Sequence, residues 1–264
     1  MVASCGARPG GRPTLTGVAA TPNAPTTSAP TGRRTLRVGH KGADGLVPGN
    51  TRASFDAALG AGVDMIEFDV LAEPGTGRLV MAHDGEHLRG AESLEEGLGH
   101  LADDSFAGVE LDVDLKLPGY EAEVVAALRR FGLAGRGVIS TQYRESLAAL
   151  RAIDPGLRIG WSVPRARRDY TETWWSALTA RGLLAVGRRV LPRQAAAALR
   201  RGRCDALMAH WRLVTPALAR AVAAAGGELY VWTVDDSAEI RRVAGLGVAG
   251  IISNDPRLLT GVGP

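Results

Sequence analysis

The chain has 264 residues, of which 45% are hydrophobic and 5% aromatic, and its formal net charge is only +3. One closed barrel of eight strand–helix units needs about 250 residues, so a single large domain accounts for this length. The small net charge does not predict a nucleic-acid-binding surface. No run of about 18 apolar residues predicts a membrane span.

The amino terminus and the cysteines bear on the compartment. The opening residues, MVASCGARPGGRPTLTG, lack the apolar centre of a secretory signal. Cys5 and Cys204 lie far apart and show neither a disulfide framework nor a zinc-binding spacing. We therefore expect a cytoplasmic protein that neither binds nucleic acid nor inserts stably into a membrane. The sequence leaves the oligomeric state open.

Residues 1–34 are rich in Pro, Thr, Ala, Gly and Ser, which predicts a disordered or loosely attached tail before a folded domain at 35–264. In that domain, strand-like runs alternate with helical patterns. The expected strands are 35–40, 64–70, 109–116, 136–140, 157–163, 204–209, 228–234 and 249–253. The expected helices lie near 51–61, 93–103, 120–131, 144–152, 170–181, 192–201, 215–225 and 237–244.

Eight strands, each followed by helical sequence, predict an α/β fold of the (β/α)8 TIM-barrel type. An open doubly wound sheet is the rival fold, but it usually has fewer strands, and no GxGxxG follows the first strand. The segment RLVMAHD follows a Pro-Gly turn after the second strand. We expect it to return as a small β-hairpin extension that carries His83 over the barrel mouth.

Acidic side chains recur at alternate positions near the ends of two predicted strands. Successive strand residues face opposite ways, so Glu67 and Asp69 point together, and so do Asp112 and Asp114. His40 closes the first strand at the same end. Active sites of barrels form at the carboxyl ends of the strands, so these residues predict a site there.

Several carboxylates in a confined pocket repel one another and lose solvation, so they take up protons unless a cation pairs with them. Mg²⁺ and Ca²⁺ prefer oxygen ligands, and no His/Cys cluster has zinc spacing. Glu67-x-Asp69 alone is equally explained as a polar strand end. Together with His40, His83 and Asp114 it predicts a divalent metal site, with Mg²⁺ or Ca²⁺ as the cofactor.

Lysine is rare in this chain. Among 31 basic residues only Lys41 and Lys116 are lysines, and both lie at predicted strand ends beside the acidic residues. Lysine is a compact point charge, whereas arginine is a wide planar fork, so a tight phosphate pocket favours lysine. The alternative is that two lysines remain by chance in an arginine-rich chain.

Several motifs together resemble one known family. They are GHKGADGLVPGNTRASFDAALGAGVDMIEFDV, RLVMAHD, VDLK, VWTVDD and GIISNDP, in this order between residues 36 and 257. The chain resembles the glycerophosphodiester phosphodiesterase family. The resemblance implies a TIM barrel that hydrolyses a small phosphodiester to glycerol 3-phosphate and an alcohol. It also implies catalytic histidines, metal ligands and a phosphate-binding lysine: His40, His83, Glu67, Asp69, Asp114 and Lys116.

The implied mechanism is acid–base catalysis beside a metal ion. One histidine takes a proton from the attacking hydroxyl and the other gives a proton to the leaving alkoxide. By analogy with related barrel phospholipases, the attacking group can be the substrate's own hydroxyl, which forms a cyclic phosphate first. Which histidine is the base stays open. Lys41, Asn50 and Trp232 are further candidates for binding the substrate or its phosphate, and Trp161 is a rim or core residue.

The chain departs from the family pattern at four positions. The family usually has His-Arg at the first strand, Pro-Glu-Asn-Thr after it, glutamate as the third metal ligand and WTVN on the seventh strand. This chain has Lys41, Gly49, Asp114 and Asp235 there. The segment between His83 and VDLK is also short, so we expect a more open pocket.

Two other functions are compatible with the sequence. A related barrel phospholipase would act on lysophospholipids or sphingolipid phosphodiesters, and a catalytically silent barrel would only bind phosphate esters. Loss of the glutamate at position 49 favours the silent barrel, whereas the histidines and carboxylates argue against it. We expect His87, His100 and His210 to have no catalytic role.

Overall fold

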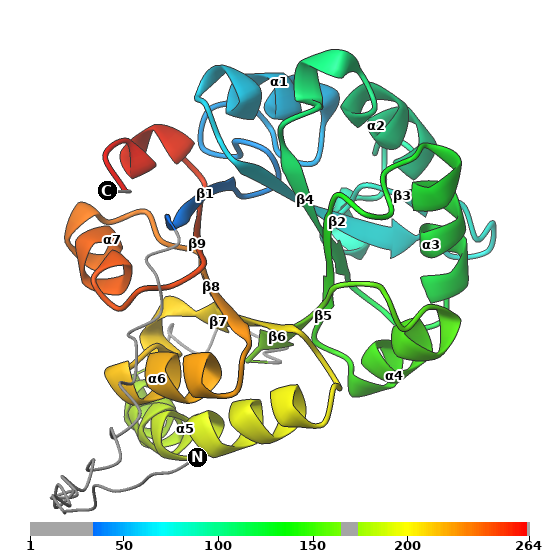
Figure 1. Cartoon of the computed structure of the whole chain (residues 1–264). Helices are drawn as coiled ribbons and strands as arrows, with labels where there is room; N and C mark the ends of the chain where they lie inside the picture. The colour runs from blue at the N-terminus through cyan, green and yellow to red at the C-terminus, as the bar shows by residue number, and fades with distance from the viewer. Residues whose placement is uncertain (1–33, 165–173, 263–264) are drawn as a thin grey trace, which may run out of the picture. The chain divides into compact units, whose positions relative to one another are not determined.

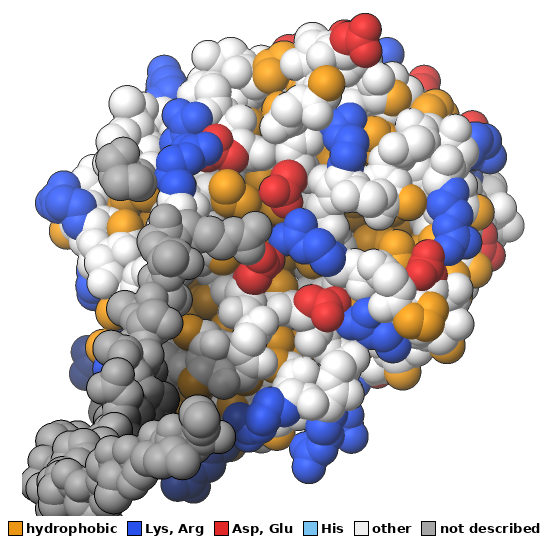
Figure 2. All heavy atoms as spheres, in the orientation of Figure 1, with side chains coloured by type: hydrophobic (Ala, Val, Ile, Leu, Met, Phe, Trp, Pro, Cys, Tyr) orange, Lys and Arg blue, Asp and Glu red, His pale blue; other side chains and the backbone are white. Residues whose placement is uncertain are grey.

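The computed structural model describes residues 34–164 and 174–262 of the chain. The predicted tail at 1–34 lies outside the described residues apart from Arg34, and so do residues 170–173 of one predicted helix. Among the residues that are described, no helix is long and apolar enough to cross a membrane. On the face shown in Figure 2, acidic and basic side chains are interspersed.

Eight parallel strands form a closed barrel with the helices outside it (Figure 1). The strands are β1 (Leu36–Gly39), β2 (Met65–Ala72), β4 (Glu110–Leu115), β5 (Gly137–Thr141), β6 (Ile159–Val163), β7 (Ala206–His210), β8 (Glu228–Trp232) and β9 (Gly250–Ser253). Strand β1 pairs with both β9 and β2, which closes the ring. The predicted TIM barrel is therefore confirmed.

The helices mostly lie where the sequence predicts them. They are α1 (Arg52–Gly60), α2 (Leu94–Leu101), α3 (Glu121–Arg130), α4 (Arg144–Ile153), α5 (Trp174–Arg200), α6 (Pro216–Ala224) and α7 (Ser237–Ala244). Short 3-10 helices span Gly85–His87, Asp104–Phe106, Trp211–Leu213 and Pro256–Leu259.

The expectation of two separate helices at 170–181 and 192–201 is wrong for the described part of this segment, because α5 runs unbroken through Pro192. A proline inside a helix removes one backbone hydrogen bond and strains the preceding turn. Leu191, Ala195 and Leu199 are buried at a spacing of four residues, so one helical face packs against the rest of the protein. That burial offsets the local cost of the proline.

A short hairpin extends β2 beyond the barrel, as the sequence predicts. Strand β3 (Leu79–Val80) runs antiparallel to β2, with Leu71 opposite Val80 and Ala72 opposite Leu79. The amide of Glu73 donates to the carbonyl of Arg78 and begins the turn. The hairpin lies at the carboxyl end of β2 and delivers residues 81–84 to the site.

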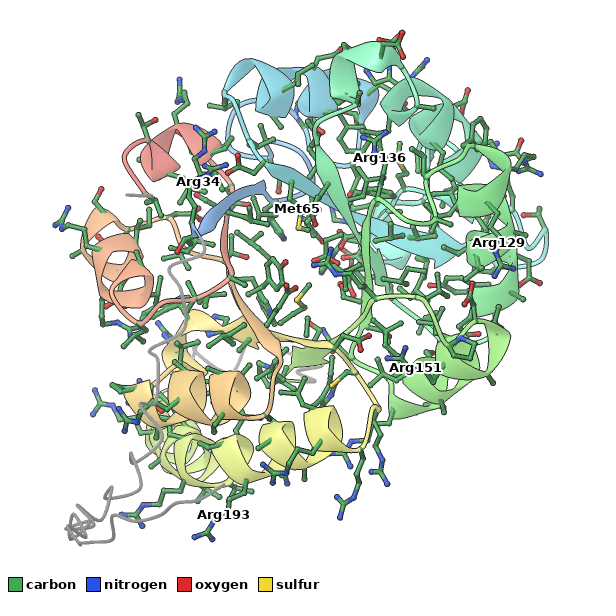
Figure 3. The ribbon with its side chains drawn as sticks, viewed as in Figure 1. Arg34, Met65, Arg129, Arg136, Arg151 and Arg193 are labelled. Atoms are coloured by element: carbon green, nitrogen blue, oxygen red, sulfur yellow. The ribbon has the colours of Figure 1, made fainter. Side chains whose placement is uncertain are left out.

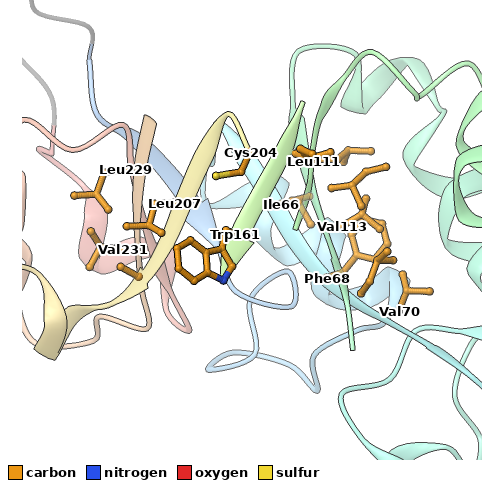
Figure 4. Packing of buried hydrophobic residues seen from close by; sticks show 14 of the residues in the cluster. Ile66, Phe68, Val70, Leu111, Val113, Trp161, Cys204, Leu207, Leu229 and Val231 are labelled. Carbon is orange, nitrogen blue, oxygen red and sulfur yellow. The ribbon is translucent and has the colours of Figure 1, made fainter. Parts of the chain in front are cut away.

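Alternation along the strands separates two apolar layers. In β2, Ile66, Phe68 and Val70 belong to the large cluster that packs strands against helices (Figure 4). Met65 belongs instead to the small cluster inside the barrel and lies toward its centre in Figure 3. The residues that follow on the Met65 face are Glu67 and Asp69, so the same period of two that fills the barrel floor places carboxylates at its mouth.

An arginine ties strands together at the amino end of the barrel. Arg158 precedes β6 and donates to Glu110 at 2.9 Å, to Glu228 at 2.7 Å and to the hydroxyl of Tyr230 at 3.2 Å. These partners belong to β4 and β8, so one side chain crosses the base of the barrel.

We predict that Arg158→Met lowers stability by about 1–2 kcal/mol, because charged hydrogen bonds are lost at a site that is only partly exposed. For a domain of this size that is a fall in Tm of roughly 3–6 °C, measured by thermal denaturation. Arg130→Met, which breaks an exposed pair with Glu95, is the control and should change Tm little. Equal effects of the two variants would contradict the assignment.

Candidate active site

The titratable residues gather in a cavity of about 660 Å³ that the barrel strands line at their carboxyl ends. Its walls include His40, Lys41, Glu67, His83, Asp112, Asp114, Lys116, Ser140, Gln142, Ser162, His210, Arg212 and Trp232. A second cavity of about 770 Å³ lies between α4 and α5. It is lined mainly by arginine and apolar side chains and contains no carboxylate or histidine among the described residues, so the candidate site residues belong to the first cavity.

The loop after β1 carries His40 and wraps around Glu67. The backbone amide of Lys41 donates to Glu67 Oε2 at 2.8 Å, and the amide of Gly42 donates to the carbonyl of Glu67 at 3.0 Å. Lys41 has φ +49°, a left-handed conformation that bends the chain sharply after β1. The bend holds the Glu67 carboxylate beside His40, whose Nε2 lies 3.9 Å from Glu67 Oε2.

Asn50 lies behind Asp69 and does not line the cavity. Its amide nitrogen donates to Asp69 Oδ2 at 2.9 Å, and its amide oxygen accepts the backbone N–H of Asp69 at 2.9 Å. Asn50 has φ +56°, which asparagine tolerates better than most residues. The structure therefore places this candidate phosphate ligand in contact with a carboxylate, and its two bonds fix the orientation of Asp69.

Three carboxylates meet at the centre of the site. In the pairing of β2 with β4, Glu67 lies opposite Asp112 and Asp69 opposite Asp114. Oxygens of Glu67, Asp69 and Asp114 lie within 4.8 Å of one another, and all three side chains are buried. These are the three residues that the resemblance implies as metal ligands.

Burial and mutual repulsion shift the acidities of this cluster. Burial, together with the charge of Asp69, raises the pKa of Glu67 well above its ordinary value. Burial and the charge of Asp114 raise the pKa of Asp112 to about 8. Burial alone would raise the pKa of Asp69 as well, but Lys116 and His83 hold it well below the usual range. Glu67 and Asp112 therefore tend to keep protons, which a bound cation would displace.

Lys116 supplies the cation nearest to these carboxylates. Its ammonium lies 2.5 Å from Asp69 Oδ1 and 2.5 Å from Asp114 Oδ2. Burial would lower the pKa of Lys116, but these two carboxylates raise it above its ordinary value, so the side chain stays charged. Lys41 lies on the cavity wall and pairs with Asp44 at 3.4 Å.

His83 lines the same cavity as His40 and contacts a different carboxylate. It follows the β3 hairpin, and its Nδ1 lies 3.0 Å from Asp69 Oδ2. The carboxylate accepts a hydrogen bond, so this nitrogen carries a proton and Nε2 faces away from Asp69. The His83 side chain is 49% exposed, whereas the His40 side chain is 18% exposed. Burial lowers the pKa of His40.

The cavity also holds residues that the sequence patterns did not single out. His210, expected to have no catalytic role, lines the cavity with its ring 5.2 Å from that of Trp232 and nearly perpendicular to it. His210 ends β7 and lies opposite Trp232 in the β7–β8 register. Its position at a strand end was the feature of the sequence that could have predicted its place in the cavity. Trp232 reaches the cavity as expected. Trp161 packs in the outer apolar cluster and is a core residue.

The donor set fits a hard divalent cation. Glu67, Asp69 and Asp114 offer carboxylate oxygens on rigid strands, and Asp112 Oδ1 is a further buried oxygen without a hydrogen-bond partner among the described residues. Mg²⁺ and Ca²⁺ take such oxygen ligands. A parallel barrel with a carboxylate cluster that could hold a cation, a lysine and two imidazoles at its mouth fits the TIM-barrel class of phosphodiesterases.

Residues 40–115 and 110–258 match the glycerophosphoryl diester phosphodiesterase family. The chain belongs to this family and is a phosphoric diester hydrolase. A glycerophosphodiester phosphodiesterase of Caldanaerobacter subterraneus subsp. tengcongensis is 26% identical over 262 residues, covering 86% of this chain and 96% of that protein.

Solved structures share the fold. A glycerophosphodiester phosphodiesterase from Agrobacterium tumefaciens aligns with a TM-score of 0.64 and 23% identity, over 86% of this chain and 100% of that one. An Oleispira antarctica phosphodiesterase, solved in complex with the product sn-glycerol-3-phosphate, aligns with a TM-score of 0.63 and 18% identity, over 85% of this chain and 95% of that one.

We predict that the metal-free protein loses stability as pH rises from about 5 to 8. Asp112 keeps its proton in the folded protein up to a pKa of about 8, whereas the unfolded chain releases it near 4. The folded state therefore binds more protons in this window, so each pH unit costs up to about 1.4 kcal/mol. A divalent cation should accordingly raise Tm more at pH 8.5 than at pH 6.

Thermal denaturation with and without Mg²⁺ or Ca²⁺ measures this effect. Asp112→Asn removes one buried ionisation and should flatten the fall in Tm with pH. Asp104→Asn, at an exposed position outside the cavity, should not change it. A Tm that rises between pH 6 and 8 in the metal-free wild type, with no such rise in Asp112→Asn, would contradict the raised pKa of Asp112.

Proposed function

We propose that the chain hydrolyses glycerophosphodiesters to glycerol 3-phosphate and an alcohol, with Mg²⁺ or Ca²⁺ as the cofactor and His40 and His83 as the acid–base pair. One observation carries the proposal: two imidazoles lie beside different members of a cluster of three buried carboxylates. The family supports the phosphodiester chemistry, and the product bound to the Oleispira protein supports glycerol 3-phosphate.

Glu67, Asp69 and Asp114 would hold the cation, which when bound neutralises charge on the phosphate and lowers the pKa of a coordinated hydroxyl. The imidazoles handle the protons. One takes a proton from the attacking hydroxyl and the other returns a proton to the leaving alkoxide. An ordinary histidine pKa near 6.5 allows both transfers close to neutral pH.

The remaining candidates bind and orient the substrate. Lys116 is charged and buried beside the carboxylates, so it stabilises phosphate oxygens that enter the same space. Lys41 adds a second cation on the wall, and its pairing with Asp44 aims it. Trp232 supplies an apolar surface for the glycerol or the leaving alcohol. Asn50 acts indirectly by holding Asp69.

The first test is turnover. Purified full-length protein, incubated with glycerophosphocholine and Mg²⁺ or Ca²⁺, should release glycerol 3-phosphate, measured with a coupled dehydrogenase assay. EDTA should abolish the release, and added metal should restore it. Turnover that persists in EDTA would rule out an essential cation, and no turnover with either metal would refute this substrate class for the protein.

The second test concerns the histidines. We predict that His40→Ala and His83→Ala each lower kcat by about 100-fold or more, because each removes a general acid or base. His87→Ala is the matched control: His87 lies four residues from His83, is exposed and bonds only Asp84. A variant of His40 or His83 with the activity of the control would remove that residue from the mechanism.

A further inference from the structure

We propose that Asn254 and Asp235 are positioning residues that hold His40 in the tautomer with a proton on Nδ1 and a bare Nε2, so that His40 can act as the base of the first step. The inference rests on the proposed function for its catalytic consequence. The tautomer itself follows from the contacts around the ring.

Barrel closure brings Asn254 beside His40. Strands β1 and β9 are parallel neighbours in which Gly39 lies opposite Ser253, and His40 and Asn254 are the next residues. The amide of His40 donates to the carbonyl of Ser253 at 2.9 Å, which continues the ladder by one step. In this register Asn254 Oδ1 lies 2.6 Å from His40 Nδ1.

Asp235 determines which end of the Asn254 side chain faces the histidine. Asn254 Nδ2 donates to Asp235 Oδ2 at 2.7 Å. The other oxygen of Asp235 accepts from the backbone amide of Asn254 at 2.8 Å and from Ser253 Oγ at 2.8 Å. A carboxylate only accepts hydrogen bonds, so the NH₂ group of Asn254 must face Asp235. Its carbonyl oxygen must then face His40.

An amide oxygen is an acceptor, so His40 Nδ1 must be the donor. A neutral imidazole has one N–H, which leaves Nε2 with a free lone pair. That nitrogen points to the carboxylate side of the ring, 3.9 Å from Glu67 Oε2. His40 can therefore accept a proton there but has none to give in its neutral form.

The proton balance follows. His40 Nε2 takes the proton of the attacking hydroxyl as its oxygen bonds to phosphorus, and His40 becomes an imidazolium that still donates through Nδ1 to Asn254. The bond from phosphorus to the leaving oxygen breaks. His83 must enter this step as the imidazolium, with Nδ1 donating to Asp69, and it gives its Nε2 proton to the leaving oxygen. The protonated His40 and the neutral His83 then exchange roles if a cyclic phosphate is hydrolysed in a second step.

A neutral amide suits this place better than a second carboxylate would in the wild-type chain. Glu67, Asp69, Asp112 and Asp114 already concentrate negative charge at the mouth. In the wild-type chain, asparagine orients the ring without adding charge. Asp235 contacts Asn254 on the side away from His40, and its carboxylate accepts hydrogen bonds from Asn254 and Ser253.

The test combines kinetics with a direct observation of the ring. In Asp235→Asn, the Asn254 amide loses its fixed acceptor and can turn its NH₂ group toward His40, which moves the ring proton to Nε2. We expect kcat for glycerophosphocholine to fall by about 30-fold or more with KM within threefold. Asn254→Ala should behave similarly.

The double variant D235N/N254D is the rescue. The amide introduced at position 235 would donate to the carboxylate introduced at position 254, and that carboxylate would accept from His40 Nδ1. The bond between positions 235 and 254 is then remade with donor and acceptor exchanged, while His40 Nδ1 still donates to position 254. We expect its kcat to recover to within about fivefold of wild type.

Asp255→Asn is the control, because Asp255 is the next residue but pairs with Arg257. It should leave kcat and KM unchanged.

Nitrogen-15 NMR of protein labelled at histidine reports the tautomer without any turnover. The His40 ring, assigned by its loss in His40→Ala, should show a protonated Nδ1 and a bare Nε2 in neutral wild-type protein. The two positions should exchange or mix in Asp235→Asn. If Asp235→Asn does not fold, the wild-type spectrum and the kcat of the double variant still test whether Asn254 and Asp235 set the tautomer of His40.

A wild-type ring protonated on Nε2 would overturn the inference, and so would near-normal kcat in both single variants. Failure of this inference can be distinguished from failure of the proposed function. A protein that turns over no glycerophosphodiester but shows the expected ring protonation refutes the substrate, whereas an active protein with the opposite tautomer refutes only the role of Asn254 and Asp235.

Discussion

The site depends on the mutual repulsion of carboxylates that the barrel forces together. Glu67 and Asp69 on β2 lie in register with Asp112 and Asp114 on β4, so the spacing of two hydrogen-bonded strands fixes their separation. Rigid strands cannot spread to relieve the repulsion, and burial removes most of the water that would screen it. Lys116 neutralises part of the charge. The rest makes the cluster receptive to a divalent cation and to the N–H group of His83.

Much of this arrangement could be predicted from the sequence because a strand has a strict period of two. That period places Glu67, Asp69 and Asp114 on one face whatever the neighbouring helices do, and the hairpin that delivers His83 follows from its Pro-Gly turn. Helix boundaries depend more on tertiary packing. Two separate helices were expected at 170–181 and 192–201, yet burial of Leu191 and Ala195 keeps α5 continuous through Pro192.

Contacts between distant segments could not be predicted in this way. Asn50 holds Asp69, and Asn254 meets His40, through side-chain bonds that no local period encodes. His210 reaches the cavity because β7 and β8 pair in one particular register. Each of these residues lies at or beyond a strand end. A search of barrel sequences for site residues should therefore include every polar residue near the carboxyl ends of the strands.

The departures from the family pattern have local partners in the structure. A side chain at Gly49 would place its Cβ 2.7 Å from Lys41 Cβ and 2.6 Å from Asp44 Oδ1, so a glutamate there requires this loop to move. Asp44 instead accepts the Gly49 amide and pairs with Lys41. The changes at 41 and 49 thus belong to one rearranged loop with its own carboxylate, and they do not show that the site has decayed.

Barrel closure and acid–base chemistry are therefore one structural event. His40 and Asn254 are 214 residues apart and meet only when β1 pairs with β9, the step that turns a curved sheet into a ring. The same closure pairs β1 with β2 and sets the His40 loop against Glu67. An open sheet would keep the carboxylates of β2 and β4 together but would leave His40 without an oriented proton. The closed ring is what adds an oriented imidazole to the carboxylate cluster.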